Sequence, residues 1–167
     1  MADTTMVADG ASPSIGSSAI PMDDPLLRAV LEYWHELRGE RAMPRRREID
    51  PVLLPRRTLP HLLILRVDGH GFRYGLVGTA IELQFGMSIA GHRPEDLPFA
   101  PDCEAIVTQH RETAETQRPT YREDEFTDWN QQTRHCRRLL LPLSDDGTTV
   151  TDLFGIWLFL RKRPSGA

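Results

Sequence analysis

The sequence predicts an α+β domain: five antiparallel strands in one sheet, helices on one face of it, and a further helix flanking the N-terminal side. Two observations predict this class. A hairpin pattern at residues 61–77 is separated from three strand patterns at 120–160 by a segment with helical features, and this order builds an antiparallel sheet covered by helices. The composition, 40% apolar and 26% charged, is that of a globular domain.

The 167 residues divide into three segments. Residues 1–22 are rich in Ala, Ser, Thr and Gly, and their small apolar content does not offset the entropy lost on ordering, so they predict a disordered tail. Residues 23–60 predict a flanking helix followed by a connector rich in proline and arginine. Residues 61–163 predict the core domain.

The flanking helix has clear start and stop signals. Asp24 suits the N-cap, Pro25 the first turn, and Gly39 the C-terminal stop. The helix carries one apolar stripe made of Leu27, Val30, Leu31 and Trp34. The stripe either packs on the domain's own sheet or forms the two-fold contact of a homodimer, and the pattern leaves both open.

The connector at residues 40–60 is interrupted by prolines, so no long helix or central strand runs through it. These prolines are Pro44, Pro51, Pro55 and Pro60. We expect an extended chain with a short helical turn at residues 50–54. The segment also carries Arg41, Arg45, Arg46, Arg47, Arg56 and Arg57. These arginines favour a solvated connector, with an acidic partner surface as the alternative.

Two strands at residues 61–67 and 72–77, joined by a Gly-rich turn, predict a hairpin. Thr79 suits the cap of a short helix that ends at Gly86, and a helical turn is expected at 94–97. A longer helix at 102–117 is expected to direct Ile106, Val107, His110 and Ala114 to one face.

Three strands are predicted at residues 120–127, 134–143 and 150–160. The last strand is the most apolar segment of the chain, so we expect it at the centre of the sheet.

Residues 76–97 read LVGTAIELQFGMSIAGHRPEDL. This segment resembles the core block of PAS domains, in which a strand ends, a short helix ends in Gly86, and Gly91 precedes the Asp96-Leu97 pair. Gly78 stands where many PAS domains have Asn, so a local side-chain cap common in that superfamily is absent here.

The N-terminal part resembles the leader of a bacterial family of short stand-alone PAS proteins. The residues that carry this second resemblance are Tyr33-Trp34, Leu37-Arg38-Gly39, Pro44, Arg46, Ile49-Asp50-Pro51 and Leu59-Pro60. The two blocks together cover about residues 26–160. The resemblance implies a module that senses a signal or binds a protein, rather than an enzyme.

The resemblance also implies a ligand pocket between the sheet and its helices. Candidate lining residues are Leu65, Tyr74, Phe85, Val107, His110 and Trp157. Haem-binding PAS domains take an axial histidine from the long helix where His110 stands, although a core histidine is the simpler explanation. The N-C-R-F-L-Q motif of flavin-adduct domains of the LOV type is absent, so the cofactor stays undetermined.

No nucleophile elbow, phosphate loop or dinucleotide motif is present, so the sequence predicts no catalytic residue. The alternative is a small-pocket enzyme, isomerase-like or hydrolase-like, that uses His110 with Glu123, Glu125 or Asp128. We expect these acidic residues, with Asp124, to pair instead with Arg134, Arg137 and Arg138 on the next strand. The neighbours His135 and Cys136 point to opposite faces of a strand, which disfavours a metal site.

The formal charge of −4 disfavours a nucleic-acid partner. Two cysteines outside any CxxC motif, with no secretory signal and no spanning segment, predict a cytoplasmic protein with no membrane contact. The chain ends soon after the last strand, so we expect its output to act in trans on a signalling protein. Ligand, partner and oligomeric state stay open.

Overall fold

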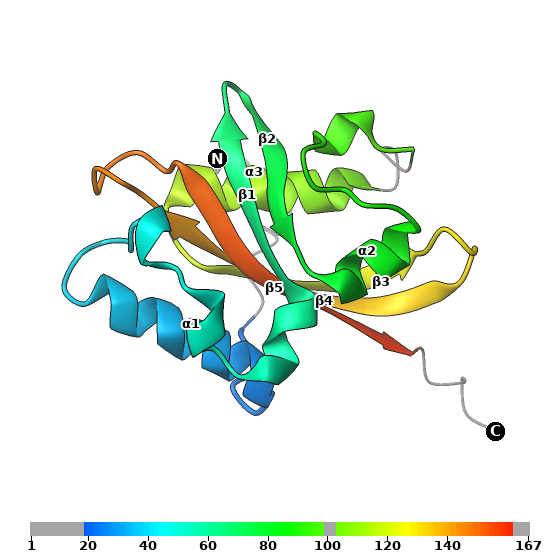
Figure 1. The fold of residues 1–167 in the computed structure, drawn as a ribbon, viewed down its shortest axis with the longest axis horizontal. Helices are drawn as coiled ribbons and strands as arrows, with labels where there is room; N and C mark the ends of the chain where they lie inside the picture. Colours follow the sequence, from blue (N-terminus) through cyan, green and yellow to red (C-terminus); the bar gives the residue numbers. More distant parts are fainter. Residues whose placement is uncertain (1–18, 99–102, 162–167) are drawn as a thin grey trace, which may run out of the picture.

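The computed structural model describes residues 19–98 and 103–161. Five antiparallel strands form one sheet in the order β2-β1-β5-β4-β3 (Figure 1). The strands are β1 (Leu62–Asp68), β2 (Gly71–Val77), β3 (Thr120–Thr127), β4 (Thr133–Leu143) and β5 (Asp152–Arg161). The predicted antiparallel sheet is therefore confirmed. The tail expected at 1–22 lies outside the described residues up to position 18, as do residues 162 and 163 of the expected core.

The helices are α1 (Pro25–Arg38), α2 (Thr79–Phe85) and α3 (Glu104–Thr116). Short 3-10 turns, η1 (Arg46–Glu48), η2 (Pro51–Leu53) and η3 (Arg56–His61), divide the connector, and η4 (Pro94–Asp96) precedes α3. Within the described ranges, no helix has the length and apolar character needed to cross a membrane.

The strand β5 lies between β1 and β4, at the centre of the sheet, as its composition predicts. Residues 152–158 are all buried, on both faces of the sheet. Alternation puts Trp157 and its neighbour Arg138 on one face, and Phe154 with its neighbour Leu141 on the other. Both faces are therefore covered by other parts of the chain.

The helices that connect the strands cover one face, and the flanking helix covers the opposite one. On the first face, Gln109 of α3 bonds to Thr120 and Arg138. On the second, the ring of Tyr33 in α1 contacts Phe154 edge-on, with centroids 6.4 Å apart. In Figure 1, α3 passes behind β1 and β2, whereas α1 lies apart from it, below the sheet.

The ends of α1 confirm the predicted signals. The Asp24 carboxylate accepts hydrogen bonds from the amides of Leu26 and Leu27, Pro25 opens the helix, and Gly39 ends it at φ +55°. The positive φ explains the glycine, because side chains with a Cβ rarely adopt that conformation.

The apolar stripe of α1 packs on the protein's own sheet, which is the first of the two alternatives. Leu27, Val30, Leu31 and Trp34 are all buried within the chain. The indole Nε1 of Trp34 donates a 2.9 Å hydrogen bond to the carbonyl of Pro142 in β4. These four side chains are therefore not available for a homodimer contact, which corrects that expectation.

Two expectations for the helices between the strands need correction. The N-cap of α2 is Gly78 rather than Thr79, and it makes no side-chain cap bond. A Cβ at Gly78 would lie 2.2 Å from the carbonyl oxygen of Pro60, so the close approach of the connector explains why no Asn stands there. In α3, Ile106 and His110 are buried as expected, but the other two buried positions are Gln109 and Thr113, whereas the expected Val107 and Ala114 are only half-buried.

Candidate functional site

Four of the six expected pocket residues, Tyr74, Phe85, His110 and Trp157, contact one another on the sheet face under α2 and α3. Leu65, Tyr74, Phe85, His110 and Trp157 are buried, and Val107 is half-buried. The His110 ring stacks on Trp157 with centroids 6.1 Å apart, and Tyr74 contacts both rings. We call Tyr74, Phe85, His110 and Trp157, whose rings contact one another, the aromatic cluster.

His110 is a neutral core residue in this cluster. Its Nε2 lies 3.2 Å from the hydroxyl of Tyr74. Burial, and secondly the charge of Arg138, lower the pKa of His110 to about 3. Nε2 meets Tyr74 and the ring packs against Trp157 and Phe72, whereas Nδ1 is buried without a hydrogen-bond partner in the described part of the chain.

The structure does not bring His110 together with the three carboxylates of the enzyme alternative. Glu123 and Glu125 occupy positions of β3 that share the opposite face with His135. Glu123 accepts hydrogen bonds from Tyr121 and His135 on that face. Asp128 lies in the β3–β4 turn, where it accepts hydrogen bonds from the amides of Asn130 and Gln132. A shared acid–base pair with His110 is not formed.

The predicted cross-strand ion pairs are present. Arg137 Nε lies 3.3 Å from Glu123, Arg134 Nε lies 3.5 Å from Asp128, and Arg138 Nη1 lies 2.6 Å from Asp124. As expected, His135 and Cys136 point to opposite faces: His135 bonds to Glu123, while Cys136 is buried near Arg138. Burial raises the pKa of the Cys136 thiol to about 12.

One of these pairs differs from the others because Arg138 is almost completely buried. Its side chain is 1% exposed, whereas that of Asp124 is 33% exposed. Nη1 and Nη2 donate to the two oxygens of Asp124 at 2.6 and 2.7 Å, and Nε donates to Oε1 of Gln109 at 3.0 Å. Burial would lower the pKa of Arg138, but the hydrogen bonds and charge of Asp124, with Cys136, outweigh it and the pKa is raised.

Gln109 connects this ion pair to the rest of the sheet. Its Nε2 donates to the carbonyl of Arg138 at 3.1 Å and to the Thr120 hydroxyl at 3.2 Å. The hydroxyls of Thr113 and Thr120 lie 2.6 Å apart. A buried polar network thus joins α3 to β3 and β4, and each of its bonds is stronger here than in water because the surroundings are apolar.

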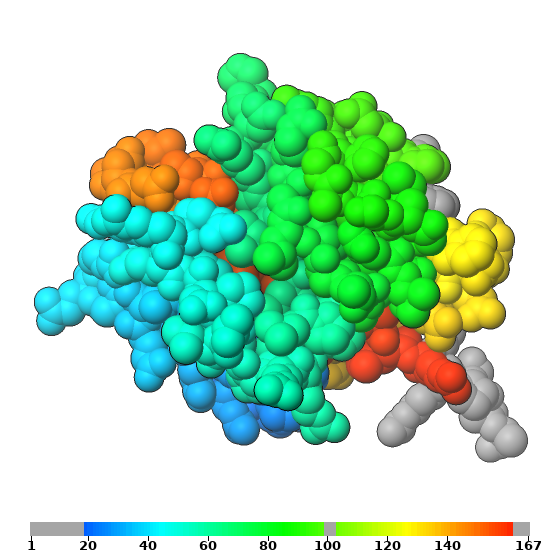
Figure 2. Space-filling model, viewed as in Figure 1, coloured from blue at the N-terminus to red at the C-terminus, as the bar shows by residue number. Residues whose placement is uncertain are grey.

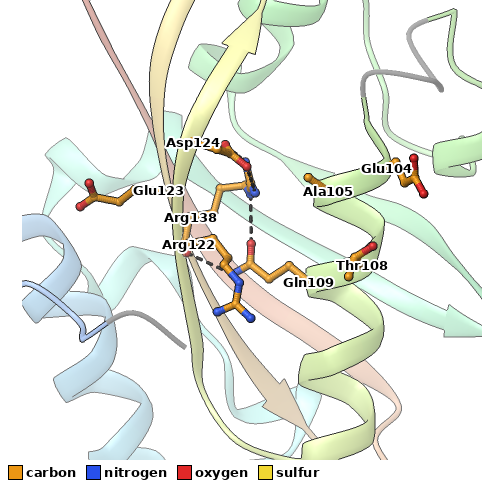
Figure 3. Close-up of a pocket in the computed structure, with 8 residues that line it drawn as sticks. All are labelled: Glu104, Ala105, Thr108, Gln109, Arg122, Glu123, Asp124 and Arg138. Carbon is orange, nitrogen blue, oxygen red and sulfur yellow. Dashed lines mark hydrogen bonds and ion pairs between the residues drawn. The ribbon is translucent and has the colours of Figure 1, made fainter. Parts of the chain in front are cut away.

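The network forms the floor of an open cleft between α3 and β3, with a volume of about 450 Å³. Figure 3 shows Arg138 beneath Asp124 and facing Gln109, with Glu104, Ala105 and Thr108 along the helix. The cleft residues are Glu104, Ala105, Thr108, Gln109, Arg122, Glu123, Asp124 and Arg138. Glu123 points to the other side of β3 in Figure 3. The cleft is therefore lined by both charged and apolar surface.

Each cation of the cleft has a carboxylate partner. Arg122 pairs with Glu112 of α3, and Arg138 pairs with Asp124. Glu104 is exposed and forms no ion pair with a described residue. The unmatched charge in the cleft is negative, so groups that donate hydrogen bonds are favoured over anions.

The sequence predicted ion pairs between the acidic residues of β3 and the arginines of β4, but neither the specific Arg138–Asp124 pair nor its place under a cleft. The sequence feature that could have indicated an inward-facing Gln109 is its position in the helix, one residue before His110. A polar residue flanking the apolar stripe is usually solvent-exposed, so the sequence pattern did not distinguish it.

A family model described as "PAS domain" matches residues 22–158, which include α1, the connector and nearly all of the sheet. The chain belongs to the PAS domain family. The predicted family is thus confirmed, and a sensory signalling domain is the general role of such folds. No curated protein matches this sequence.

Solved structures with the same fold are distant in sequence. The LOV protein of Rhodobacter sphaeroides is 13% identical, with a TM-score of 0.50, covering 62% of this chain and 61% of its own. VqmA bound to DPO is 16% identical, with a TM-score of 0.50 and coverages of 63% and 55%. The Vibrio cholerae VqmA dimer is 15% identical, with a TM-score of 0.51 and coverages of 61% and 47%. This PAS domain therefore matches about half of each VqmA chain.

Proposed function

We propose that this PAS domain is a sensory domain that binds a small polar molecule in the cleft between α3 and β3 and signals in trans to a separate protein. One observation carries the proposal: Arg138 is 1% exposed beneath the cleft, and its carboxylate partner Asp124 stays 33% exposed in the cleft wall. At a charged pair in the bottom of a cleft, a polar group of a ligand can replace the water that contacts the exposed carboxylate.

The energetics support a role beyond packing. Removing an arginine from water costs several kcal/mol, and the attraction of one carboxylate often only balances that cost. An apolar side chain of similar volume in place of Arg138 would join α3 to the sheet without this desolvation cost. Burial of Arg138 therefore adds little stability to the fold, whereas the Arg138–Asp124 pair can serve as a contact for a ligand.

The chemistry of the cleft favours a particular ligand class. Its volume of about 450 Å³ lies in the usual range for small-molecule sites, about 300–1,000 Å³. Asp124 and Glu104 accept hydrogen bonds, so an amine, amide or hydroxyl compound is favoured. VqmA, about half of which shares this fold, has a structure in which it is bound to DPO.

The network suggests how binding changes the domain. A donor group at Asp124 competes with Arg138 for the same oxygens and so changes the bond between Arg138 and Gln109. Since Gln109 belongs to α3, the ligand shifts the balance between two positions of this helix. The aromatic cluster lies beside Arg138, which is paired with Trp157 in the sheet and whose charge acts on His110.

The test combines native mass spectrometry of freshly purified protein with calorimetric titration of the compounds that raise its melting temperature. The screen uses small amines, amides and polyols. The Asp124→Asn variant should weaken binding about 10-fold to 100-fold, the usual effect of losing a hydrogen bond to a charged group. Glu115→Gln is the control, because Glu115 is exposed on α3 and does not line the cleft. If the Asp124→Asn variant bound the ligand with the affinity of the wild type, the ligand site would lie outside this cleft.

Two further parts of the proposal concern assembly and location. The Vibrio cholerae VqmA dimer is an example of a dimer with this fold; a homodimer through α1 of this chain would use its exposed side, which carries Glu32, His35 and Glu36. Both cysteines are free thiols, which suits a cytoplasmic protein. Sedimentation velocity of the wild-type protein tests the dimer directly.

A further inference from the structure

A second hollow lies far in sequence from the cleft, where the connector meets the end of β2. Its volume is about 320 Å³ and its walls are mainly apolar. The lining residues are Pro51, Leu59, Pro60, Leu62, Leu76, Val77, Gly78 and Thr79. We call it the connector groove. In Figure 2 the connector, cyan to teal, lies against the green segment that follows β2 on this face.

The groove is preformed. The amide of Gly78 donates a 2.7 Å hydrogen bond to the carbonyl of Leu62. A Cβ at Gly78 would lie 2.2 Å from the oxygen of Pro60, so the residue that follows β2 already touches the connector. The Tyr33 hydroxyl accepts a 2.8 Å bond from the amide of Asp50, which attaches the connector to α1. A peptide that binds in the groove would therefore not lose free energy by ordering the residues that line it.

Exposed apolar side chains occur in the groove lining, at Leu76, and directly after the lining residue Pro51 in sequence. Val52 and Leu53, which follow Pro51 in η2, are 82% and 70% exposed, and Leu76 is 41% exposed. They are three of the seven exposed large apolar residues in the described part of the chain. Scattered apolar residues need no explanation, but residues gathered beside an apolar groove indicate a binding surface.

Unpaired arginines accompany this apolar surface. Arg56 and Arg57 are exposed in η3, the same turn that supplies Leu59 and Pro60 to the groove. Neither forms an ion pair with a described residue, whereas Arg41 pairs with Glu48. Another hollow, of about 520 Å³, is lined by Arg45, Arg46 and Arg47 from the earlier part of the connector, together with Asp145. The local charge is thus positive although the chain as a whole carries −4.

The edge of β2 does not leave room for an added strand along its middle. The amide of Tyr74 donates to the carbonyl of His92, and its carbonyl accepts from the amide of Gly91. Residues 91–92 therefore occupy the hydrogen-bonding positions that a partner strand would need. A helix laid into an apolar groove is a common way of binding a peptide segment that needs no free sheet edge.

We propose that the connector groove docks an acidic amphipathic helix of a partner protein: its apolar face enters the groove beside Leu53 and Leu76, and its carboxylates meet Arg56 and Arg57. This inference deepens the partner half of the proposed function and is independent of the ligand in the α3–β3 cleft. The apolar groove supplies binding energy, and the arginines select for acidic sequences.

The test is fluorescence anisotropy of the full chain with three labelled helical peptides of equal length. One has Leu and Phe at positions i, i+4 and i+7 with a Glu-rich polar face. The second has the same apolar face with Lys in place of Glu, and the third is a scrambled acidic sequence. We expect the first to bind best, with an affinity that falls as salt is raised.

Two groove variants and two controls complete the design. The Leu53→Ser/Leu76→Ser variant should weaken the acidic peptide about 10-fold, as loss of central apolar contacts does. Arg56→Glu/Arg57→Glu should reverse the preference between acidic and basic peptides. The controls are Leu160→Ser and Arg111→Glu, which change exposed residues elsewhere, and they should bind like the wild type.

Several outcomes would overturn the docking proposal. These are equal binding of the acidic and basic peptides, unchanged binding by the groove variants, or equally tight binding of a DNA duplex. If the Leu53→Ser/Leu76→Ser variant, without peptide, sedimented with a different mass from the wild type, the groove would be the contact with a second copy of this chain. Ligand titration of the same variants separates the two proposals, because groove variants should keep the affinity of the α3–β3 cleft.

Discussion

The indole ring of Trp129, in the β3–β4 turn, lies directly against the backbone of Gly86 at the end of α2. A Cβ at Gly86 would lie 2.5 Å from Cγ of this ring. The Trp129 amide donates to the carbonyl of Gln84 and the indole Nε1 donates to that of Leu83, both at 3.2 Å. The turn is thereby attached to α2, although the two are more than 40 residues apart in sequence.

Gly86→Ala should test this attachment. Gly86 has φ +68° and Gly91 has φ +81°, but only Gly86 has a neighbour within 4 Å of the added Cβ. The left-handed conformation alone costs about 1–2 kcal/mol for Ala, and the displaced indole should add about 1 kcal/mol. Urea unfolding should therefore show a greater loss in Gly86→Ala than in Gly91→Ala. In a Trp129→Ala background the two substitutions should cost about the same; a persistent difference would contradict the contact.

The Arg138–Asp124 pair should respond unequally to removal of either partner. Asp124→Ala leaves Arg138 buried and unpaired, which should cost about 3 kcal/mol, near the low end for breaking a buried pair because Asp124 is partly exposed. Arg138→Met leaves Asp124 facing water and should cost less, about 1–2 kcal/mol. Urea unfolding measures both. Glu112→Ala removes a partly exposed partner of Arg122 and should cost under about 1 kcal/mol; the reverse order would contradict the buried role of Arg138.

His110 should make the protein less stable in acid. Its pKa is about 3 in the folded protein and about 6.5 when unfolded. Between these values the unfolded chain binds a proton that the folded chain does not, so stability is full above pH 6.5 and falls with pH. At pH 5 the loss from this group should be about 2 kcal/mol.

His110→Phe keeps a ring against Trp157 and removes the titration. The difference in unfolding free energy between pH 7 and pH 5 should therefore be about 2 kcal/mol smaller in this variant than in the wild type. Other groups titrate in both proteins and cancel in the comparison. Parallel stability curves across this range would show that His110 is not buried in the neutral form.

Trp34 should be a stability residue rather than a contact between copies. It is 3% exposed and bonds to Pro142, so Trp34→Ala should cost about 3–5 kcal/mol, as for other buried aromatic residues. Thermal unfolding measures this loss, and Glu36→Ala on the exposed side of α1 is the matched control. If the folded Trp34→Phe protein changed its sedimentation mass, the assignment of the stripe to the protein's own sheet would be wrong.

Local patterns predicted much of the fold. Asp24, Pro25 and Gly39 gave the bounds of α1, because caps and stops depend on the conformation of one or two residues. Strand-like runs bounded by turn residues predicted all five strands, and the apolar run at 150–160 placed β5 at the centre. The glycine block at 76–97 predicted the family, and Gly86 does adopt the left-handed conformation that its role at the helix end requires.

The sequence by itself determined the elements, their order and the central strand, since these follow from contacts within a few residues. Only the tertiary structure decided that α1 covers the face opposite α3, that Gln109 and Thr113 face inward, and that the Arg138–Asp124 pair lies under an open cleft. These features depend on residues up to about a hundred positions apart, as in the bond from Trp34 to Pro142. A pattern with period 2 or 3.6 states which residues share a face, but the partner of that face is chosen by packing of the whole chain.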